Sequence, residues 1–132
     1  MITLSNIHEF TDEQVFDEVE RLLLLQGAKS VSPASNSRCL YSDGQGNRCA
    51  VGLLMDHYDP SFECNTLHCI LEKFWPSALP KEPILRILQN IHDNHNPEEW
   101  EYVFSSTRAS LFNNLSESLN EIIYEYKTIQ YT

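Results

Sequence analysis

The sequence predicts a mainly α-helical fold of the α+β class, with five or six helices and one β-hairpin inserted after the first helix. Three observations lead to this prediction: apolar residues recur at helical spacing in several separate stretches, capping residues precede these stretches, and a glycine-containing turn separates two β-prone runs. A chain of 132 residues, of which 42% are hydrophobic, has the size and composition of one folded domain. We therefore expect residues 1–132 to form a single domain.

The first helix is expected over residues 11–26. Thr11 and Gln14 have the spacing of a capping box, in which each side chain binds the backbone N–H of the other residue. Gly27 is the residue type that most often ends a helix. Between these signals the apolar residues keep helical spacing, and they are Val15, Phe16, Val19, Leu22 and Leu23.

The hairpin is expected in the segment that follows. Residues 29–37 are small and polar with one proline, which indicates an irregular connection. Residues 38–42 and 47–51 are β-prone and flank the turn Asp43-Gly44-Gln45-Gly46, so they are expected to pair. The second arm is expected to lead directly into a short helix at residues 50–55.

Two helices and a connector are expected next. Apolar residues line one face of a helix that ends ahead of Pro76, and they are Leu67, Ile70, Leu71 and Phe74. Three prolines, Pro76, Pro80 and Pro83, form a stiff connector. A second, strongly apolar helix then runs to about His95, and it carries Ile84, Leu85, Ile87, Leu88 and Ile91.

The chain is expected to end in two more helices. Asn96 and Pro97, followed by Glu98 and Glu99, have the residue types of a helix start, because the carboxylates favour the positive end of the helix dipole. The helix that begins at Pro97 carries Trp100, Val103, Phe104 and Leu111. A last helix is expected over residues 115–127, with Leu115, Leu119, Ile122, Ile123 and Tyr126 on its inner face.

The charge distribution argues against direct nucleic-acid binding. Nine Lys and Arg against nineteen Asp and Glu give a net charge of −10, which repels phosphates. The same charge makes an acidic mimic of DNA one alternative function. Residues 27–50 hold three basic residues and one acidic residue, and this is the net-positive part of an otherwise acidic chain. Its basic residues, Lys29, Arg38 and Arg48, are candidates to hold a phosphate or carboxylate group.

The sequence carries no recognisable export signal and no membrane span. Its start lacks a basic region followed by an apolar run, and its longest aliphatic stretch is only Leu22–Leu25. We therefore expect a cytoplasmic protein without a membrane partner. In a reducing cytosol the four cysteines are expected to be free thiols rather than disulfides.

A motif spans residues 38–55. Its pattern is Cys-x-Tyr, a glycine turn, a basic residue, Cys, Ala, an aliphatic residue and Gly. The residues that carry this pattern are Arg38-Cys39-Leu40-Tyr41, Gly44 and Arg48-Cys49-Ala50-Val51-Gly52. This pattern resembles that of a family of small uncharacterised bacteriophage and prophage proteins. Further matches are Leu25-Gln26-Gly27, Leu88-Gln89-Asn90-Ile91-His92-Asp93 and Pro97-Glu98-Glu99-Trp100, so the resemblance covers roughly residues 15 to 105. It implies a phage-type source, a bacterial host cytoplasm and no particular reaction.

A metal centre is an alternative interpretation of the cysteines. Its candidate ligands are Cys39, Cys49, Cys64, His68 and Cys69. Structural zinc usually binds closely spaced pairs, whereas Cys39 and Cys49 are ten residues apart, so buried reduced cysteines are favoured and no cofactor is expected.

A small cysteine-dependent enzyme is a second alternative. Cys49 at a helix start would be the nucleophile and His92 the base, with Asp93 beside it. Adjacent residues on a helix point in different directions, and no oxyanion hole is recognisable, so a structural role for His92 against the hairpin backbone is favoured.

The favoured function is binding, with the hairpin as the working surface. Its candidate contact residues are Arg38, Tyr41, Gln45, Arg48 and Tyr58, because a glycine turn that projects from a helical body is a frequent site of function. The expected partner is a host protein or a small anionic ligand, as in host take-over or counter-defence. The competing interpretation is that Cys39, Tyr41 and Cys49 only fix the hairpin to the helices.

Overall fold

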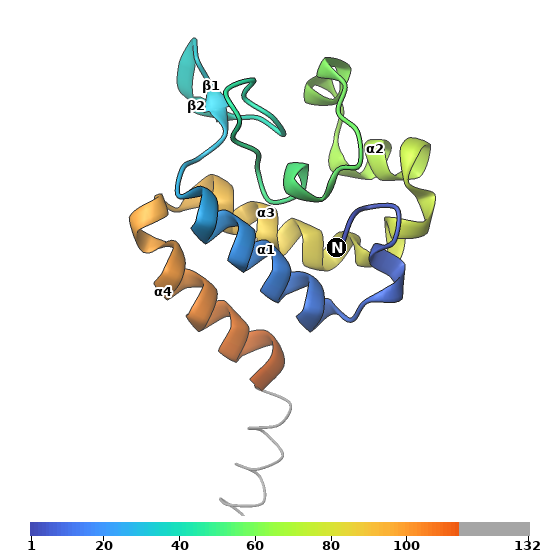
Figure 1. Ribbon diagram of the computed structural model, residues 1–132, viewed down its shortest axis with the longest axis vertical. Helices are drawn as coiled ribbons and strands as arrows, with labels where there is room; N and C mark the ends of the chain where they lie inside the picture. Colours follow the sequence, from blue (N-terminus) through green and yellow to red (C-terminus); the bar gives the residue numbers. More distant parts are fainter. Residues whose placement is uncertain (114–132) are drawn as a thin grey trace, which may run out of the picture.

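The computed structural model describes the backbone of residues 1–113 and, apart from residues 35–37 and 113, their side chains. Within this range it contains four α-helices and one two-stranded antiparallel sheet (Figure 1). The predicted class, mainly α with one inserted hairpin, is thereby confirmed. The expected helix 115–127 lies outside the described residues.

Helix α1, Asp12–Gln26, begins and ends as its sequence predicts. The Thr11 hydroxyl accepts a hydrogen bond from the backbone N–H of Gln14 at 3.1 Å, and the Gln14 side chain accepts one from the backbone N–H of Thr11 at 2.8 Å. Gly27 follows the helix with φ +67°, a left-handed conformation that favours glycine.

The two strands lie earlier in the chain than expected. Strand β1, Val31–Ser32, pairs antiparallel with β2, Ser35–Cys39, so Pro33 and Ala34 form the turn. The prediction that residues 29–37 are irregular is therefore wrong. Proline suits the second position of a tight turn, and backbone hydrogen bonds, such as that from Leu40 N–H to the Ser30 carbonyl at 2.9 Å, continue the pairing.

The prediction that residues 38–42 pair with residues 47–51 along their length is also wrong. The pairing is limited to one isolated bridge between Ser42 and Arg48. The glycine turn between them does form, with φ +75° at Gly44 and +98° at Gly46. We call residues 40–51 the glycine loop.

Helices α2, α3 and α4 follow the predicted order. Their bounds are Leu67–Phe74, Glu82–Asn94 and Pro97–Arg108. The expected short helix at residues 50–55 is a 3₁₀ turn, Gly52–Leu54, and the proline connector is largely helical as well. The other short elements are the 3₁₀ helices Ile7–Glu9, Pro60–Cys64 and Pro76–Lys81, and the π-helical turn Ala109–Asn113.

The core lies among α1, α3 and α4, which contact one another pairwise, and it extends to α2, whose Leu67, Ile70 and Leu71 are buried. Phe16 of α1 and Phe104 of α4 are fully buried, with ring centroids 5.5 Å apart in an edge-to-face arrangement. Trp100, also fully buried, lies at the start of α4. The N-terminal segment completes the core through Leu4 and Ile7, which show no helical periodicity and were not predicted.

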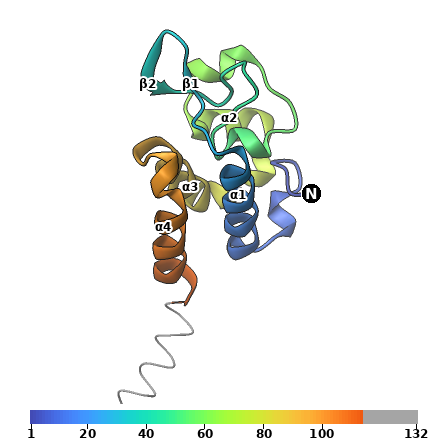
Figure 2. The same cartoon turned by 60° about the vertical axis from the view of Figure 1, so that its left-hand side comes forward.

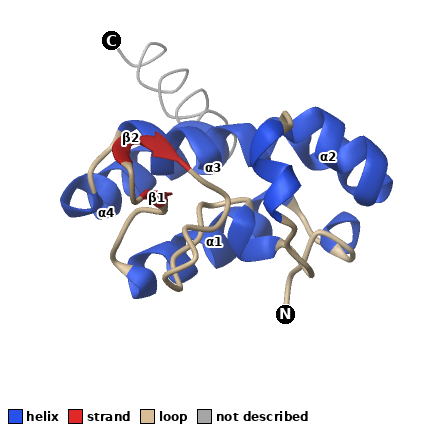
Figure 3. Cartoon of the chain, turned by 90° about the horizontal axis from the view of Figure 1, so that it is seen from above, coloured by secondary structure: helices blue, strands red, loops and turns tan. Residues whose placement is uncertain are grey.

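The helices form a base on which the irregular part of the chain lies. Figure 2 shows α1, α3 and α4 side by side, with the hairpin and the segment that leads to α2 above them. Seen from above, the strands lie near the end of α3 and the start of α4 (Figure 3). Among the described residues, no helix combines the length and the apolar character that crossing a bilayer requires.

Candidate functional site

Backbone and side-chain hydrogen bonds together close the glycine loop. The Asp43 N–H donates to the Asn47 carbonyl at 3.1 Å, and the Cys49 N–H donates to the Tyr41 carbonyl at 3.3 Å. The Asp43 carboxylate accepts from the backbone N–H groups of Gln45 at 2.7 Å and Asn47 at 3.1 Å, and from the Asn47 side-chain amide at 3.1 Å. Burial raises the pKa of Asp43, but these hydrogen bonds outweigh burial and hold the pKa below its ordinary value. The tip of the loop is thus ordered while Gln45 remains exposed.

Glu63, from the 3₁₀ helix Pro60–Cys64, fixes one side of the loop. Its carboxylate accepts from the backbone N–H groups of Tyr41 at 3.0 Å and Ser42 at 3.2 Å, and from the Tyr58 hydroxyl at 2.5 Å. Burial, followed by this hydrogen bond to Glu63, raises the pKa of Tyr58. Glu63 was not predicted, because a single carboxylate in a proline-containing segment has no pattern that marks it.

Gln26, the last residue of α1, fixes the other side of the loop. Its side chain accepts from the Arg48 backbone N–H at 2.9 Å and donates to the Arg48 carbonyl at 2.8 Å. The same amide nitrogen donates to the Ala28 carbonyl at 2.8 Å. One glutamine therefore satisfies both backbone groups of a residue 22 positions further along the chain.

The Cys-Ala-Val-Gly part of the motif, residues 49–52, lies directly against the backbone of Tyr41. A Cβ atom at Gly52 would lie 2.0 Å from the Tyr41 carbonyl oxygen, so only glycine fits. The Cys49 sulfur accepts from the Gly52 backbone N–H at 3.3 Å, and the Gln89 side chain of α3 accepts from the Val51 backbone N–H at 3.2 Å. Cys49, Val51 and Gly52 thus hold the backbone in place. This agrees with the interpretation that the motif fixes the hairpin to the helices.

The five predicted contact residues divide into two groups. Arg38 and Gln45 are exposed. Tyr41, Arg48 and Tyr58 are half-buried and engaged within the molecule: the Arg48 guanidinium donates to the Gly52 carbonyl at 3.1 Å and lies 5.8 Å from the centroid of the Tyr58 ring. Of the five predicted contact residues, three therefore have side chains that already make contacts within the molecule.

His92 is fully buried and joins the hairpin region to α3. Its Nε2 accepts a hydrogen bond from the Ser30 backbone N–H at 3.0 Å. An accepting ring nitrogen carries no proton, so in the neutral ring the proton resides on Nδ1, which donates to the Asp93 carboxylate at 2.8 Å. His92 thus has the structural role, a hydrogen bond to the backbone of the hairpin region, that the sequence favours.

Cys39 completes a cluster with His92 and Asp93, whose ligating atoms lie within 4.8 Å of one another. Neither nitrogen of the neutral His92 ring has a free electron pair here, since Nε2 uses its pair on the Ser30 N–H and Nδ1 is protonated. The ring could bind a metal ion or accept the Cys39 thiol proton only if it gave up one of these two hydrogen bonds. It is therefore suited to neither role. Burial, ahead of the nearby Asp93 carboxylate, also raises the pKa of Cys39 to about 11.

The other candidate metal ligands lie apart from this cluster. Cys49 is fully buried, and Cys64 and Cys69 are exposed. His68 is engaged with carboxylates: its Nδ1 lies 2.6 Å from Glu82 and its Nε2 lies 3.2 Å from Glu72. Within the part of the chain that the structure describes, the expected ligand set is not brought together as a group of three.

Burial of Cys49 outweighs the hydrogen bonds, such as that from the Gly52 N–H, that would favour its thiolate. Burial raises its pKa to about 12, so the thiol stays protonated at neutral pH. Among the hydrogen bonds of the described residues, none joins Cys49 to His92, the proposed base.

A polar cavity of about 180 Å³ lies between the glycine loop and α3. Glu63 and Asp93 bring carboxylates to its wall, and Asn65 and Gln89 bring amides. None of its lining residues is a lysine or arginine. A small anion is therefore a poor match for this cavity.

Comparisons of the chain with protein-family models, curated proteins and solved structures found no match.

Proposed function

We propose that this chain is a phage-type accessory protein that acts by binding a host protein through the exposed tip of the glycine loop and the neighbouring Arg38. The observation that carries the proposal is the contrast between the base of the loop and its tip. Gln26 and Glu63 fix the base, whereas Gln45 and the flanking glycines are exposed. A loop held in one conformation loses little entropy on binding, which favours affinity.

A protein partner is favoured over a small anionic ligand. Lys29 and Arg38, two of the three cations of the basic segment, donate to the backbone carbonyls of Asp93 and Glu63. Arg48 donates to the Gly52 carbonyl. The three cations thus contact three separate carbonyl groups, an arrangement that suits a broad contact better than one small anion.

The phage setting rests on the resemblance carried by the motif at residues 38–55. A role in host take-over or counter-defence is what such a setting supports. The exposed tip is compatible with this role because Gly44, Gln45 and Gly46 offer hydrogen-bonding groups to a partner, and the exposed Arg38, which precedes the loop in the chain, adds a positive charge.

Two substitutions test the surface by affinity capture from bacterial host lysate, with the captured proteins identified by mass spectrometry. Arg38→Glu and Gln45→Glu each alter an exposed residue and are expected to reduce capture about tenfold, a loss of about 1.4 kcal/mol. Stability should change by no more than about 0.5 kcal/mol. Arg48 is left intact, since its side chain and backbone belong to the base of the loop.

Arg21→Glu is the matched control. Arg21 is an exposed arginine on α1, and its substitution makes the same change in charge as Arg38→Glu on a different face. The control should capture the partner as the wild type does. If Arg38→Glu and Gln45→Glu also capture the partner at wild-type level, the proposal is wrong and the interface lies elsewhere, for example on the acidic helices that a DNA mimic would use.

A further inference from the structure

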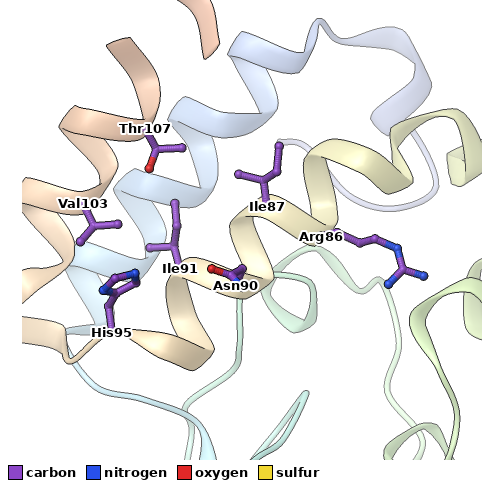
Figure 4. Close-up of a pocket in the computed structure, with 7 residues that line it drawn as sticks. All are labelled: Arg86, Ile87, Asn90, Ile91, His95, Val103 and Thr107. Atoms are coloured by element: carbon purple, nitrogen blue, oxygen red, sulfur yellow. The ribbon is translucent and has the colours of Figure 1, made fainter. Parts of the chain in front are cut away.

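Two hollows beside α3 differ in chemistry. The larger, of about 400 Å³, lies between α3 and α4, and apolar residues such as Ile87 and Val103 line it (Figure 4). Both of these side chains pack against the core, and Arg86 at its edge pairs with Glu82 at 2.6 Å. The smaller is the polar cavity of about 180 Å³ between the glycine loop and α3, and its charges are not balanced in this way.

The two carboxylates that line the polar cavity have no lysine or arginine paired with them among the described residues. Asp93 Oδ1 accepts from two neutral donors, the Gln89 amide at 2.8 Å and the neighbouring histidine ring at 2.8 Å. Glu63 accepts from two backbone N–H groups and a phenol. The nearby Lys29 and Arg38 donate to the backbone carbonyls of Asp93 and Glu63 rather than to their carboxylates.

The hydrogen-bond donors of the cavity wall are used within the protein. The Gln89 amide donates to Asp93, the Asn65 amide to the Ser61 carbonyl, and the Tyr41 hydroxyl to the Asn65 carbonyl. Asp93 Oδ2 and Asn65 Oδ1, by contrast, have no N–H or O–H donor among the hydrogen bonds of the described residues. The cavity therefore offers acceptors, and a matching ligand brings positive charge and several N–H donors.

The spread of these acceptors favours a guanidinium group over a metal ion. Asp93 belongs to α3, whereas Glu63 and Asn65 belong to the segment before α2. Glu63 is not part of the group of Cys39, His92 and Asp93, whose ligating atoms lie within 4.8 Å of one another. Metal ligands converge on one point, whereas a guanidinium group holds its N–H donors in a planar fork that reaches several acceptors at once.

We propose that the polar cavity binds the guanidinium group of a small organic cation or of a partner's arginine side chain. Hydrogen bonds from a guanidinium group to Asp93 and Glu63 would be charge-assisted, the strong class of such bonds. The site is distinct from the tip of the glycine loop, and its ligand is measured on the protein alone. The proposal therefore stands or falls separately from capture of a host protein through Arg38 and Gln45.

NMR titration of the full chain with methylguanidinium chloride tests the proposal. The side-chain amide signals of Asn65 and Gln89 should shift and then saturate, with a dissociation constant on the order of 1 mM, as the small size of the ion allows. Tetramethylammonium chloride is the control ion, because it has the same charge and ionic strength but no N–H donors. It should leave these signals unchanged at the same concentration.

Two substitutions in the cavity should change the affinity in opposite directions. Asp93→Asn keeps an oxygen for the Gln89 and His92 donors but removes the charge, and it should weaken binding at least about tenfold. Asn65→Asp adds a carboxylate and should tighten binding several-fold, so the test does not depend on one variant that loses function. Glu98→Gln, at an exposed position of α4, is the matched loss of charge and should bind as the wild type does.

Three results would overturn the proposal: shifts that do not saturate or that tetramethylammonium reproduces, unchanged affinity in Asp93→Asn, or no gain in Asn65→Asp. Adding methylguanidinium to the complex with the captured host protein distinguishes the two sources of the group. Release of the partner identifies an arginine side chain of that partner, whereas an intact complex with a saturable shift identifies a free cation.

Discussion

At the scale of single residues, His92 shows how a side chain with catalytic potential serves the fold. Its environment is defined by one backbone group, the Ser30 N–H, which determines the ring tautomer and thereby the hydrogen bond to Asp93. The sequence indicates that His92 is buried, since it continues the apolar face of α3. The sequence does not reveal the partner, because Ser30 is 62 positions away in an irregular segment.

Two substitutions of His92 are expected to separate its hydrogen bond from its bulk. His92→Leu leaves the buried Ser30 N–H without a partner, whereas His92→Gln places a carbonyl oxygen within reach of it. We expect the leucine variant to be less stable than the glutamine variant by about 1–3 kcal/mol, the cost of an unsatisfied buried donor. Urea unfolding of both variants measures the difference. Equal stabilities would show that the Ser30 hydrogen bond does not matter.

The four thiols are expected to differ in reactivity. Burial raises the pKa of Cys49 to about 12 and that of Cys39 to about 11, so their thiolates form only far above neutral pH. At pH 7 iodoacetamide should modify the exposed Cys64 and Cys69 first, and Cys49 only after unfolding. Mass spectrometry of labelled peptides over time checks the order. Rapid labelling of Cys49 in the native protein would revive the cysteine-enzyme alternative.

At the scale of elements, capping and periodicity predict the helices well, whereas the loop architecture is determined by contacts between distant residues. Helix α1 follows from Thr11, Gln14 and Gly27, which all act locally. The strands were misplaced because their pairing depends on backbone hydrogen bonds around Pro33 and not on apolar alternation. The residues that close the glycine loop, Gln26 and Glu63, lie outside it and have no local signal.

The junction between α1 and the glycine loop supplies a test at this scale. Gln26→Ala removes the two hydrogen bonds to the backbone of Arg48 and the one to the Ala28 carbonyl. We expect a loss of about 1–3 kcal/mol in the free energy of unfolding. Leu25→Ala, at the exposed neighbouring position, should change it by less than about 0.5 kcal/mol. A loss that is equal for both variants would mean that the junction is not held by Gln26.

At the scale of the whole molecule, three helices support an irregular segment, residues 27–50, whose net charge is opposite in sign to that of the rest of the chain. The sequence predicts this division, because residues 27–50 are net positive and residues 1–26 hold six acidic residues against one basic residue. It predicts the contact surface only in part. Tyr41, Arg48 and Tyr58 have the residue types of contacts, but their side chains donate to Asn65, Gly52 and Glu63, respectively.

Hydrogen–deuterium exchange of the protein, alone and with the partner captured from host lysate, tests the central claim most directly. If the protein acts through the glycine loop, the amides of residues 43–47 should exchange at least about tenfold more slowly in the complex, because binding covers the loop tip. Exchange within α1 should stay unchanged. Protection confined to α1 or the other acidic helices, with residues 43–47 unaffected, would contradict the account.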